Sequence, residues 1–589
     1  MGYSSLKACV ADLEKQGHLI RIKEEVDPYL EMSAIQLRVF QEEGKAVFFE
    51  NVKGSEFPAV SNLFGTLEQS RFIFRDTIDN VKKLVSLKAD PLSALKKPWI
   101  HLSAIASARM ALPKKVSSHS FNEIQISDLP QIQCWPMDGG PFITLPQVYT
   151  EDIDSPGVMK SNLGMYRVQL NGNDYIMNEE IGMHYQIHRG IGVHQSKSNA
   201  RSQPLKVSIF VGGPPAHTLA AVMPLPEGMS ELSFAGVMGG RRFRYVTEEG
   251  YTLSTEADFV ICGEINADDV KPEGPFGDHL GYYSLTHDFP VMRVSKVYAK
   301  KDAIWPFTVV GRPPQEDSQF GALIHEITDS IIPSEIPGII AVNAVDEAGV
   351  HPLLLAIGSE RYTPYNPERK PQELLTLSNH VLGKGQLSLA KYLMMVAHED
   401  DPNLNVNDKE SFFKHLLERI DWQRDMHFQT QTTIDTLDYS ACGGINSGSK
   451  VVFVAAGTKK RELATQIEQL SLPIGFQKAQ LVIPGVLVIE GNGETEMLTK
   501  SELPDGIALV TLVDDADFVA DHFHNWLWVT FTRSNPSDDI SGWNVANINK
   551  HWGCDIPLID ARIKEHHAPV MTMPDEVWEK AGKLIKKYK

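Results

Sequence analysis

The sequence predicts a mixed α/β protein in which a strand-rich central domain lies between two regions of alternating helices and strands. The chain has 589 residues, more than one hydrophobic core normally accommodates, so about three or four domains are expected. Residues 1–110 and the chain beyond about 320 alternate helical and strand-like patterns, whereas 155–315 consists of short β-branched runs separated by Gly and Pro. This pattern predicts a mostly antiparallel central domain, for which a barrel is one candidate form.

The N-terminal and central regions differ in their hydrophobic periodicity. In residues 1–110, Ser4–Gln16 has the spacing of an amphipathic helix, while Leu19–Lys23 and Ala46–Glu50 have the pattern of strands. Residues 111–318 contain strand-like runs such as 205–211 and 291–298 but few long helical periods. We therefore expect a small N-terminal α/β domain followed by the strand-rich domain.

The C-terminal region contains a candidate internal repeat. Two segments, 392–424 and 507–538, each run from an apolar strand through an Asp pair and an amphipathic helix to an arginine, and 18 residues separate the second Asp from the arginine in both. A chance match between two generic strand–loop–helix units is the alternative, but the equal spacing favours a partial duplication. The corresponding residues are Asp400, Asp401 and Arg419 in the first segment and Asp514, Asp515 and Arg533 in the second.

These patterns divide the rest of the chain into an α/β domain over 319–450, a duplicated or inserted α/β unit over 451–560, and a tail over 561–589. Within the tail, residues 574–588 begin with a proline and place apolar residues on one side, which predicts an amphipathic helix. The apolar face must be buried, either by its own domain or by a neighbouring protomer.

The composition excludes several classes of protein. A net charge of −19 disfavours a general role in binding nucleic acid or a membrane surface. No apolar run approaches the ~20 residues that span a bilayer, and the N-terminus lacks the apolar segment of a signal peptide. We therefore expect a cytoplasmic protein without a membrane anchor. Widely spaced cysteines without a CxxC pair favour reduced thiols, and they are Cys9, Cys134, Cys262, Cys442 and Cys554.

The most informative segment is Lys-Pro-Glu-Gly-Pro-Phe-Gly-Asp-His-Leu-Gly-Tyr-Tyr at 271–283, which carries Glu273 and Asp278 five residues apart. Its glycines and Pro275 favour a tight, irregular backbone that can bring both carboxylates to one side of a loop. Paired carboxylates near an arginine are a common acid–base device, because proximity raises one pKa and the cation lowers the other. A solvated turn is the alternative interpretation.

Further polar residues lie upstream of this segment. Arg167 is on a strand-like run; facing into a barrel it would need an anionic partner, whereas on an edge strand it would lie in water. His184 and His188 are four residues apart, but the sequence lacks the Glu and third His of a zincin. Asn162, His188 and Glu231 would supply an amide oxygen, an imidazole nitrogen and a carboxylate oxygen, which suit Mn²⁺ or Mg²⁺ better than zinc. An ordinary structural histidine is the alternative for His188.

A Gly/Ser-rich loop, Cys442–Lys450, ends on a lysine. Backbone N–H groups and an ammonium group in such a loop can hold a phosphate. The spacing differs from that of a P-loop.

Taken together and in this order, these segments resemble the UbiD-type decarboxylases that use prenylated FMN. The resemblance covers residues 1 to about 450 and implies a central split β-barrel of flavin-reductase type between N-terminal and C-terminal α/β domains. The shorter family members have nothing that corresponds to 451–560. The similar motifs are Asn-Leu-Gly-Met-Tyr-Arg (162–167), His-Arg-Gly (188–190), Pro-Leu-Pro-Glu-Gly-Met-Ser-Glu (224–231), Glu-Gly-Pro-Phe-Gly-Asp-His-Leu-Gly-Tyr-Tyr (273–283), Gly-Arg-Pro-Pro (311–314) and Ser-Gly-Ser-Lys (447–450).

The resemblance also implies roles for individual residues. Arg167, Glu273 and Asp278 match the family's catalytic triad, and an Asp at 278 is like the polyprenyl-hydroxybenzoate branch, since the ferulate and cinnamate branch usually has Glu there. Prenylated FMN is the expected cofactor, with Mn²⁺ (or Mg²⁺) bridging its phosphate and K⁺ as a further candidate ion. The expected metal ligands are Asn162, His188 and Glu231, and the other expected cofactor contacts are Met165, Arg167, Met223 and Lys450.

The functional prediction is the reversible, non-oxidative decarboxylation of an aromatic or α,β-unsaturated acid, with a hydroxybenzoate- or hydroxynaphthoate-type precursor of ubiquinone or menaquinone as the candidate substrate. Asp278 would return a proton to the carbon that loses CO₂. A flavin prenyltransferase would supply the cofactor, and we expect a homo-oligomer, either a dimer or a hexamer. The alternatives are a non-catalytic flavin-binding or scaffold homologue and a simple FMN reductase, in which the extra carboxylates and metal ligands would have no purpose.

Overall fold

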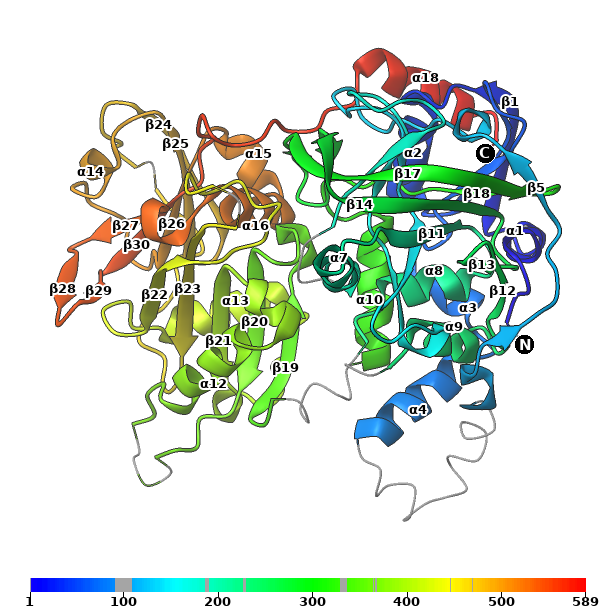
Figure 1. The fold of residues 1–589 in the computed structure, drawn as a ribbon. Coiled ribbons are helices and arrows are strands. Elements are labelled where there is room, and N and C mark those ends of the chain that lie inside the picture. The colour runs from blue at the N-terminus through cyan, green and yellow to red at the C-terminus, as the bar shows by residue number, and fades with distance from the viewer. Residues whose placement is uncertain are drawn as a thin grey trace. The chain divides into compact units, whose positions relative to one another are not determined.

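The computed structural model describes residues 2–588 apart from 90–107, 186–189, 226–228, 329–335, 364, 366–367, 445 and 469. The chain divides into two compact units (Figure 1). The first comprises Met1–Asp278, Tyr282–Ser330 and Val570–Lys589, and the second comprises His279–Gly281 and Ile331–Pro569. No helix in the described part of either unit is long and apolar enough to cross a membrane. The predicted division into five segments stays a prediction.

A nine-stranded antiparallel sheet forms the centre of the first unit. Its two long strands, β14 and β17, pair with each other, and the predicted strand at 205–211 is β11. The order is β6 (Phe142–Ile143), β9 (Val168–Gln169), β10 (Glu180–Met183), β17 (His287–Lys300), β14 (Phe259–Glu273), β11 (Leu205–Val211), β7 (Pro146–Glu151) and β8 (Ser161–Gly164), while β5 (Phe121–Ile124) pairs β17 outside this path.

The predicted split β-barrel is confirmed only as a mixed α/β fold with several sheets. Among the described residues, the end strands β6 and β8 pair with β9 and β7 and not with each other, so no closed barrel is found. The helices of this unit are α1 (Leu6–Lys15), α2 (Glu31–Glu42), α3 (Leu67–Ile73), α4 (Ile78–Ala89), α7 (Gly190–Ala200), α8 (Pro215–Val222), α9 (Glu231–Met238), α10 (Glu316–Thr328) and α18 (Asp575–Ile585).

The N-terminal elements follow the sequence pattern closely. Helix α1 begins after Ser5, whose side-chain oxygen accepts the N–H of Ala8 at 3.2 Å and so satisfies one of the free donors of the first turn. The predicted strands continue to Val26 and Val52. They belong to a four-stranded sheet of β1 (Leu19–Val26), β2 (Ala46–Val52), β3 (Ala59–Ser61) and β18 (Trp305–Pro306).

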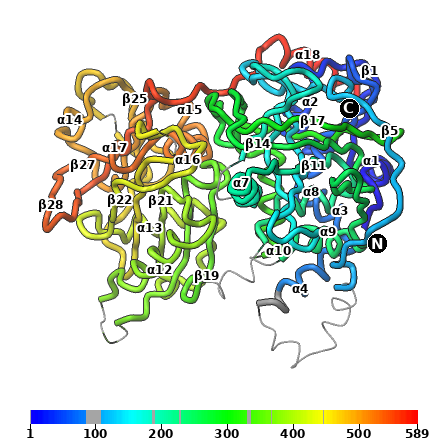
Figure 2. Tube along the Cα trace, viewed as in Figure 1, coloured from blue at the N-terminus to red at the C-terminus, as the bar shows by residue number. Residues whose placement is uncertain are grey.

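The C-terminal helix α18 lies beside α2 and β1 although it is more than 500 residues away in sequence (Figure 2). The guanidinium group of Arg38 lies 4.2 Å from the ring centre of Trp578 and donates to its carbonyl oxygen at 2.7 Å. Ala581 and Ile585 are buried in the core of the first unit. The apolar face of the predicted tail helix is thus covered by the chain's own first unit.

The second unit contains two five-stranded sheets with the same topology. In each, a first pair of strands is antiparallel, the two central pairings are parallel, and the last pair is antiparallel. The first sheet is β19 (Ile339–Ala344), β20 (Leu353–Gly358), β21 (Tyr392–Ala397), β23 (Gly448–Ala455) and β22 (Met426–Thr432), and the second is β24 (Phe476–Ile483), β25 (Val486–Gly491), β26 (Leu509–Val513), β30 (Ile556–Asp560) and β27 (Ile540–Trp543).

This matching strand order supports the internal duplication inferred from the Asp pairs. The two Asp pairs follow β21 and β26, which occupy the same place in the two sheets. The ion pairs differ, because Arg533 contacts Asp514 at 3.4 Å whereas Asp400 pairs with Arg369 at 2.6 Å. The main helices are α12 (Glu373–Leu382) and α13 (Lys409–Arg419) with the first sheet, and α15 (Ala516–Asp521), α16 (Phe523–Arg533) and α17 (Pro536–Asp539) in the repeat.

Candidate active site

Arg167, Glu273 and Asp278 meet at one end of the central sheet. Arg167 directly precedes β9, and Glu273 is the last residue of β14. The guanidinium group of Arg167 holds Glu273 with two parallel bonds, from Nε to Oε1 at 2.8 Å and from Nη2 to Oε2 at 2.9 Å. Its Nη1 donates to Oδ2 of Asp278 at 2.6 Å. The structure therefore brings together the three residues predicted to be catalytic, and their roles stay a prediction.

The site is buried, which strengthens the electrostatic interactions within it. Glu273 is fully buried, and the side chains of Arg167 and Asp278 are 9% exposed. Burial by itself raises the pKa of Glu273, but the charge and hydrogen bonds of Arg167 outweigh it and lower this pKa to about 2. Glu273 is therefore a permanent carboxylate at neutral pH.

His184 is a second partner of Glu273, with its Nδ1 3.1 Å from Oε2. Burial and the neighbouring Arg167 lower the pKa of His184, so the ring is neutral near pH 7. Because the ionised Glu273 can only accept, Nδ1 of His184 must carry the proton. The structure thus places His184 beside the three predicted catalytic residues, as a partner of Glu273.

The loop after Glu273 is held by polar contacts that the sequence motif does not reveal. Gly274 has a φ of 91°, which favours glycine, and its N–H donates to Oε1 of Gln169 at 2.9 Å. The ring of Phe276 lies under Arg167, 4.6 Å from the guanidinium carbon. Ser284 accepts a further bond from Arg167 at 2.8 Å. Both ends of the loop are thus attached to the arginine and its strand.

Asp138 is a positioning residue that sequence reasoning missed. Its Oδ1 accepts the N–H of Gly277 at 2.8 Å, and its Oδ2 accepts those of Trp135 at 2.9 Å and Cys134 at 3.2 Å. Burial raises the pKa of Asp138 to about 7, although these N–H groups oppose the shift. The only signal in the sequence is an Asp before two glycines at 138–140, which is typical of an ordinary turn.

We expect Asp138→Asn to impair catalysis more than folding. An amide offers one oxygen, so its NH₂ group must face either the N–H of Gly277 or the N–H groups of Trp135 and Cys134, and the loop before Asp278 loses an anchor. Asp138→Ala should remove all three hydrogen bonds and lower the free energy of unfolding by about 1–3 kcal/mol. Urea unfolding and kcat measured on both variants will separate the two effects. Equal kcat in Asp138→Asn and the wild type would contradict the positioning role.

Two of the predicted metal ligands lie close together in the first unit. Asn162 is on β8, and Glu231 is the first residue of α9. Burial raises the pKa of the Glu231 carboxyl, while the N–H groups of Glu231 and Leu163 oppose the shift. The Nδ2 atom of Asn162 is buried without a hydrogen-bond partner among the described residues. A half-buried carboxyl beside an unsatisfied amide fits a cation, since rotating the amide would present its oxygen.

The other predicted cofactor contacts are distributed over both units. His188 lies outside the described residues. Gly190, the next described residue after it, packs directly against Asn162, since a Cβ atom at Gly190 would overlap the Asn162 side-chain oxygen. Met165 donates its N–H to the carbonyl of Ala221 at 2.9 Å, and Met223 is buried after α8. Lys450 belongs to the second unit, on β23; burial lowers its pKa to about 8, and it donates to the carbonyl of Ser388.

The chain belongs to the UbiD family of carboxy-lyases, to which three family models assign successive parts of it. They are the 3-octaprenyl-4-hydroxybenzoate carboxy-lyase N-terminal domain at residues 10–88, the Rift-related domain at 106–313 and the C-terminal domain at 318–455. The protein is therefore a UbiD-family decarboxylase. The repeated sheet beyond residue 455 lies outside all three matches.

Individual relatives agree with this assignment. A Chlamydia pneumoniae protein, named as one of the subunits of a 4-hydroxybenzoate decarboxylase, is 37% identical, over 95% of this chain and 94% of the relative. The vanillic acid decarboxylase of Sedimentibacter hydroxybenzoicus, in its closed form, has a similar fold, with a TM-score of 0.65, 21% identity, and coverage of 80% of this chain and 96% of that one. HmfF of Pelotomaculum thermopropionicum, solved with FMN, has a TM-score of 0.59 at 21% identity and covers 80% of this chain and 97% of that one.

Proposed function

We propose that this protein catalyses the reversible, non-oxidative decarboxylation of an aromatic or α,β-unsaturated carboxylic acid with prenylated FMN and Mn²⁺ (or Mg²⁺). The observation that carries the proposal is the buried arrangement in which Arg167 holds Glu273 with two bonds and Asp278 with a third. A hydroxybenzoate- or hydroxynaphthoate-type quinone precursor is the candidate substrate. The similar Chlamydia pneumoniae protein, named for 4-hydroxybenzoate, supports this class of acid.

Asn162 and Glu231, with His188, are proposed to hold the metal ion, which would supply positive charge to balance the cofactor phosphate. Met165 and Met223 are proposed to contact the flavin, Lys450 the phosphate, and K⁺ is a further candidate ion. The solved structures of similar fold that contain FMN or prenylated FMN support a flavin. The chemistry that prenylated FMN supplies when bound is an electron sink for the pair left when CO₂ departs.

The protein's own residues are proposed to handle the proton. In the decarboxylation direction Asp278, as the acid, gives its proton to the carbon that has lost CO₂: its O–H bond breaks, a C–H bond forms, and Asp278 becomes a carboxylate. Arg167 then stabilises that carboxylate through Nη1. Glu273 remains ionised. Its negative charge beside Arg167 limits how strongly the arginine stabilises the carboxylate form of Asp278.

Substrate binding would also change the balance of charges around Arg167. A substrate carboxylate near the guanidinium group adds a negative charge close to Asp278 and raises the proton affinity of Asp278. Substrate binding would thus favour the protonated form of Asp278, which donates its proton in the next step. Carboxylation passes through the same steps in reverse, with Asp278 as the base, and the concentrations of CO₂ and acid would set the direction.

The proposal is tested by producing the protein together with a flavin prenyltransferase, which we propose as its cofactor supplier. The purified enzyme should show an absorption spectrum different from that of FMN. It should release CO₂ from members of a panel of hydroxybenzoates, hydroxynaphthoates and cinnamates, whereas protein made without the prenyltransferase should not. Full loading with the modified flavin, without CO₂ release or deuterium exchange at the ring carbon of the product, would contradict it. The protein is further proposed to be a cytoplasmic homo-oligomer.

The metal ligands can be tested without measuring activity. We expect Asn162→Ala and Glu231→Gln each to reduce bound Mn²⁺ and bound flavin, because the first removes an oxygen ligand and the second removes the negative charge of the carboxylate ligand. Elemental analysis and flavin absorbance after gel filtration will measure both. Exposed residues of β5 provide the matched controls, Asn122→Ala and Glu123→Gln, which should bind as the wild type does. Wild-type Mn²⁺ content in Asn162→Ala would contradict the ligand assignment.

A further inference from the structure

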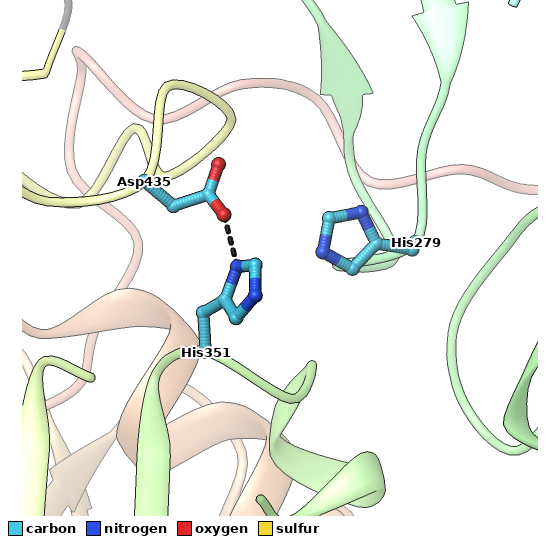
Figure 3. A group of neighbouring side chains, drawn as sticks. All are labelled: His279, His351 and Asp435. Carbon is cyan, nitrogen blue, oxygen red and sulfur yellow. Dashed lines mark hydrogen bonds and ion pairs between the residues drawn. The ribbon is translucent and has the colours of Figure 1, made fainter. Parts of the chain in front are cut away.

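A group of two histidines and one aspartate lies in the second unit and contains none of the residues assigned so far, although His279 directly follows Asp278 in the chain. His279, His351 and Asp435 each offer one ligand atom, and these atoms all lie within 4.8 Å of one another. Within the residues that the structure describes, this is the one group of three or more His, Cys, Asp or Glu side chains so arranged. Figure 3 shows the three side chains converging from different segments.

The sheet topology explains why residues so distant in sequence meet here. His351 precedes β20, Lys391 precedes β21, and the loop that carries Asp435 precedes β23; these are neighbouring parallel strands. Parallel strands place their amino ends on one edge of the sheet. The N–H of Lys391 donates to the carbonyl of His351 at 3.2 Å, which joins two of these strand starts. The segment His279–Gly281 belongs to the same unit.

The side chains of the group are oriented by direct contacts. The carboxylate of Asp435 accepts a hydrogen bond from Nδ1 of His351, drawn as the dashed line in Figure 3. The rings of His279 and His351 are nearly perpendicular, with centres 6.2 Å apart. Asp435 is buried, whereas His279 and His351 are half-buried.

The loop that carries Asp435 is itself fixed in place. Oδ1 of Asp435 accepts the N–H of Leu437 at 2.9 Å. Three residues further on, Asp438 forms an ion pair with Lys391 at 2.7 Å, and the two side chains are only 3% and 1% exposed. Metal sites in proteins are commonly supported by such outer contacts, which reduce the cost of organising the ligands.

We propose that His279, His351 and Asp435 form a metal centre that binds a divalent ion of the Zn²⁺ class through two imidazole nitrogens and one carboxylate oxygen. Two imidazoles and a carboxylate are ligands that suit Zn²⁺, Fe²⁺ and Co²⁺, and three protein ligands leave a coordination position for water. Zn–N bonds of about 2.0–2.1 Å place tetrahedral ligand atoms roughly 3.3 Å apart, so the present arrangement closes on an ion with modest side-chain movement. The ligand set shares no residue with Asn162, His188 and Glu231.

The test measures Zn²⁺ binding to the full chain, made without the flavin prenyltransferase, stripped of metal with a chelator, dialysed, incubated with Zn²⁺ and freed of the excess ion. An Asn162→Ala/Glu231→Gln background removes the other proposed site, so that any remaining Zn²⁺ reports on this centre. We expect one Zn²⁺ per chain by elemental analysis. In this background, His279→Ala and His351→Ala should each weaken Zn²⁺ binding by at least about 10- to 100-fold. That is the usual loss when a group that only supports a metal ligand is removed, and these variants remove a ligand itself. Because the imidazoles must be neutral to bind, acidification should also weaken binding.

The matched control is His380→Ala, which removes an exposed histidine of α12 in the same unit and should leave Zn²⁺ binding unchanged. Co²⁺ gives a second readout, because a low-symmetry N/O site produces visible absorption bands that should disappear with His279→Ala. Circular dichroism will show whether each variant is folded; His279 is only partly buried, so its variant keeps the test valid if His351→Ala does not fold. Absence of Zn²⁺ from the background protein, or equal affinity in His279→Ala, would mean that the group is a hydrogen-bonded cluster only.

Discussion

Replacing Glu273 by glutamine is expected to lower kcat by about 10²- to 10⁴-fold, the usual contribution of a positioned acid–base group. The change keeps the size of the side chain but removes the negative charge that faces Arg167. Arg167 would then bind the Asp278 carboxylate with nothing to balance it, and Asp278 would become a poorer proton donor and a poorer base. The measurement is kcat of the enzyme loaded with prenylated FMN, with the flavin content checked by absorbance.

The control for this variant is Asp268→Asn, which neutralises an exposed acid on the same strand, β14, without touching the site. It should have the kcat of the wild type. Full activity of Glu273→Gln, with a normal flavin content, would show that the proposed proton-handling mechanism is wrong. A loss of flavin in this variant would instead indicate a structural role, which is why loading and turnover are measured separately.

Replacing Arg167 by methionine is expected to lower the free energy of unfolding by about 3–5 kcal/mol at pH 7, because a buried charge loses its partner. Glu273 would remain fully buried, and the side-chain hydrogen bond that it keeps among the described residues is the one with His184. Activity should also be lost. A second substitution, Glu273→Gln, should recover part of the stability, since it removes the uncompensated charge. Urea unfolding of the two single variants and the double variant gives this coupling directly.

The stability of Arg167→Met relative to the wild type should depend on pH. In the wild type the pKa of Glu273 is lowered from 4.5 to about 2, so its stabilising contribution is complete above about pH 4.5 and is lost as the pH falls toward 2. This shift corresponds to roughly 3 kcal/mol. Without Arg167, burial raises the pKa of Glu273, so the variant protonates it more readily. The stability difference between wild type and variant should therefore be larger at pH 7 than at pH 3.

An exposed ion pair provides the comparison for Arg167. Arg71 contacts Glu326 at 2.8 Å on the surface of the same unit, with its side chain 54% exposed. Arg71→Met should change stability by less than about 1 kcal/mol, because water screens such pairs. A similar small effect for Arg167→Met at pH 7 would contradict the electrostatic description of the site.

Much of the secondary structure was predictable because it depends on neighbours in the sequence. The helix predicted at Ser4–Gln16, the strand predicted at Leu19–Lys23 and the amphipathic tail helix are local patterns, and each appears in the structure. The repeat was predictable from the spacing of the Asp pairs, and the shared strand order of the two sheets agrees with it. The form of the central sheet was less predictable, because closure of a barrel depends on whether strands far apart in sequence can pair.

The candidate site shows the same distinction. The motif at 273–278 indicates two carboxylates on a tight loop, but not their partners. Their convergence on Arg167 spans 106 and 111 residues of sequence and depends on the order of β9, β10, β17 and β14 in the sheet. Asp138 reaches Gly277 across 139 residues, and its turn-like sequence gives no indication of that contact.

The sequence by itself determined the type of chemistry: an arginine, two carboxylates and a separate set of oxygen and nitrogen ligands, in an order that resembles one family. Only the tertiary structure decided which charges are paired, that Glu273 is buried and held ionised by Arg167, that α18 lies against α2, and that His279, His351 and Asp435 converge. The physical reason is that residue types and local periodicity are properties of short segments. Burial, hydrogen-bond geometry and pKa instead depend on which distant strands lie side by side.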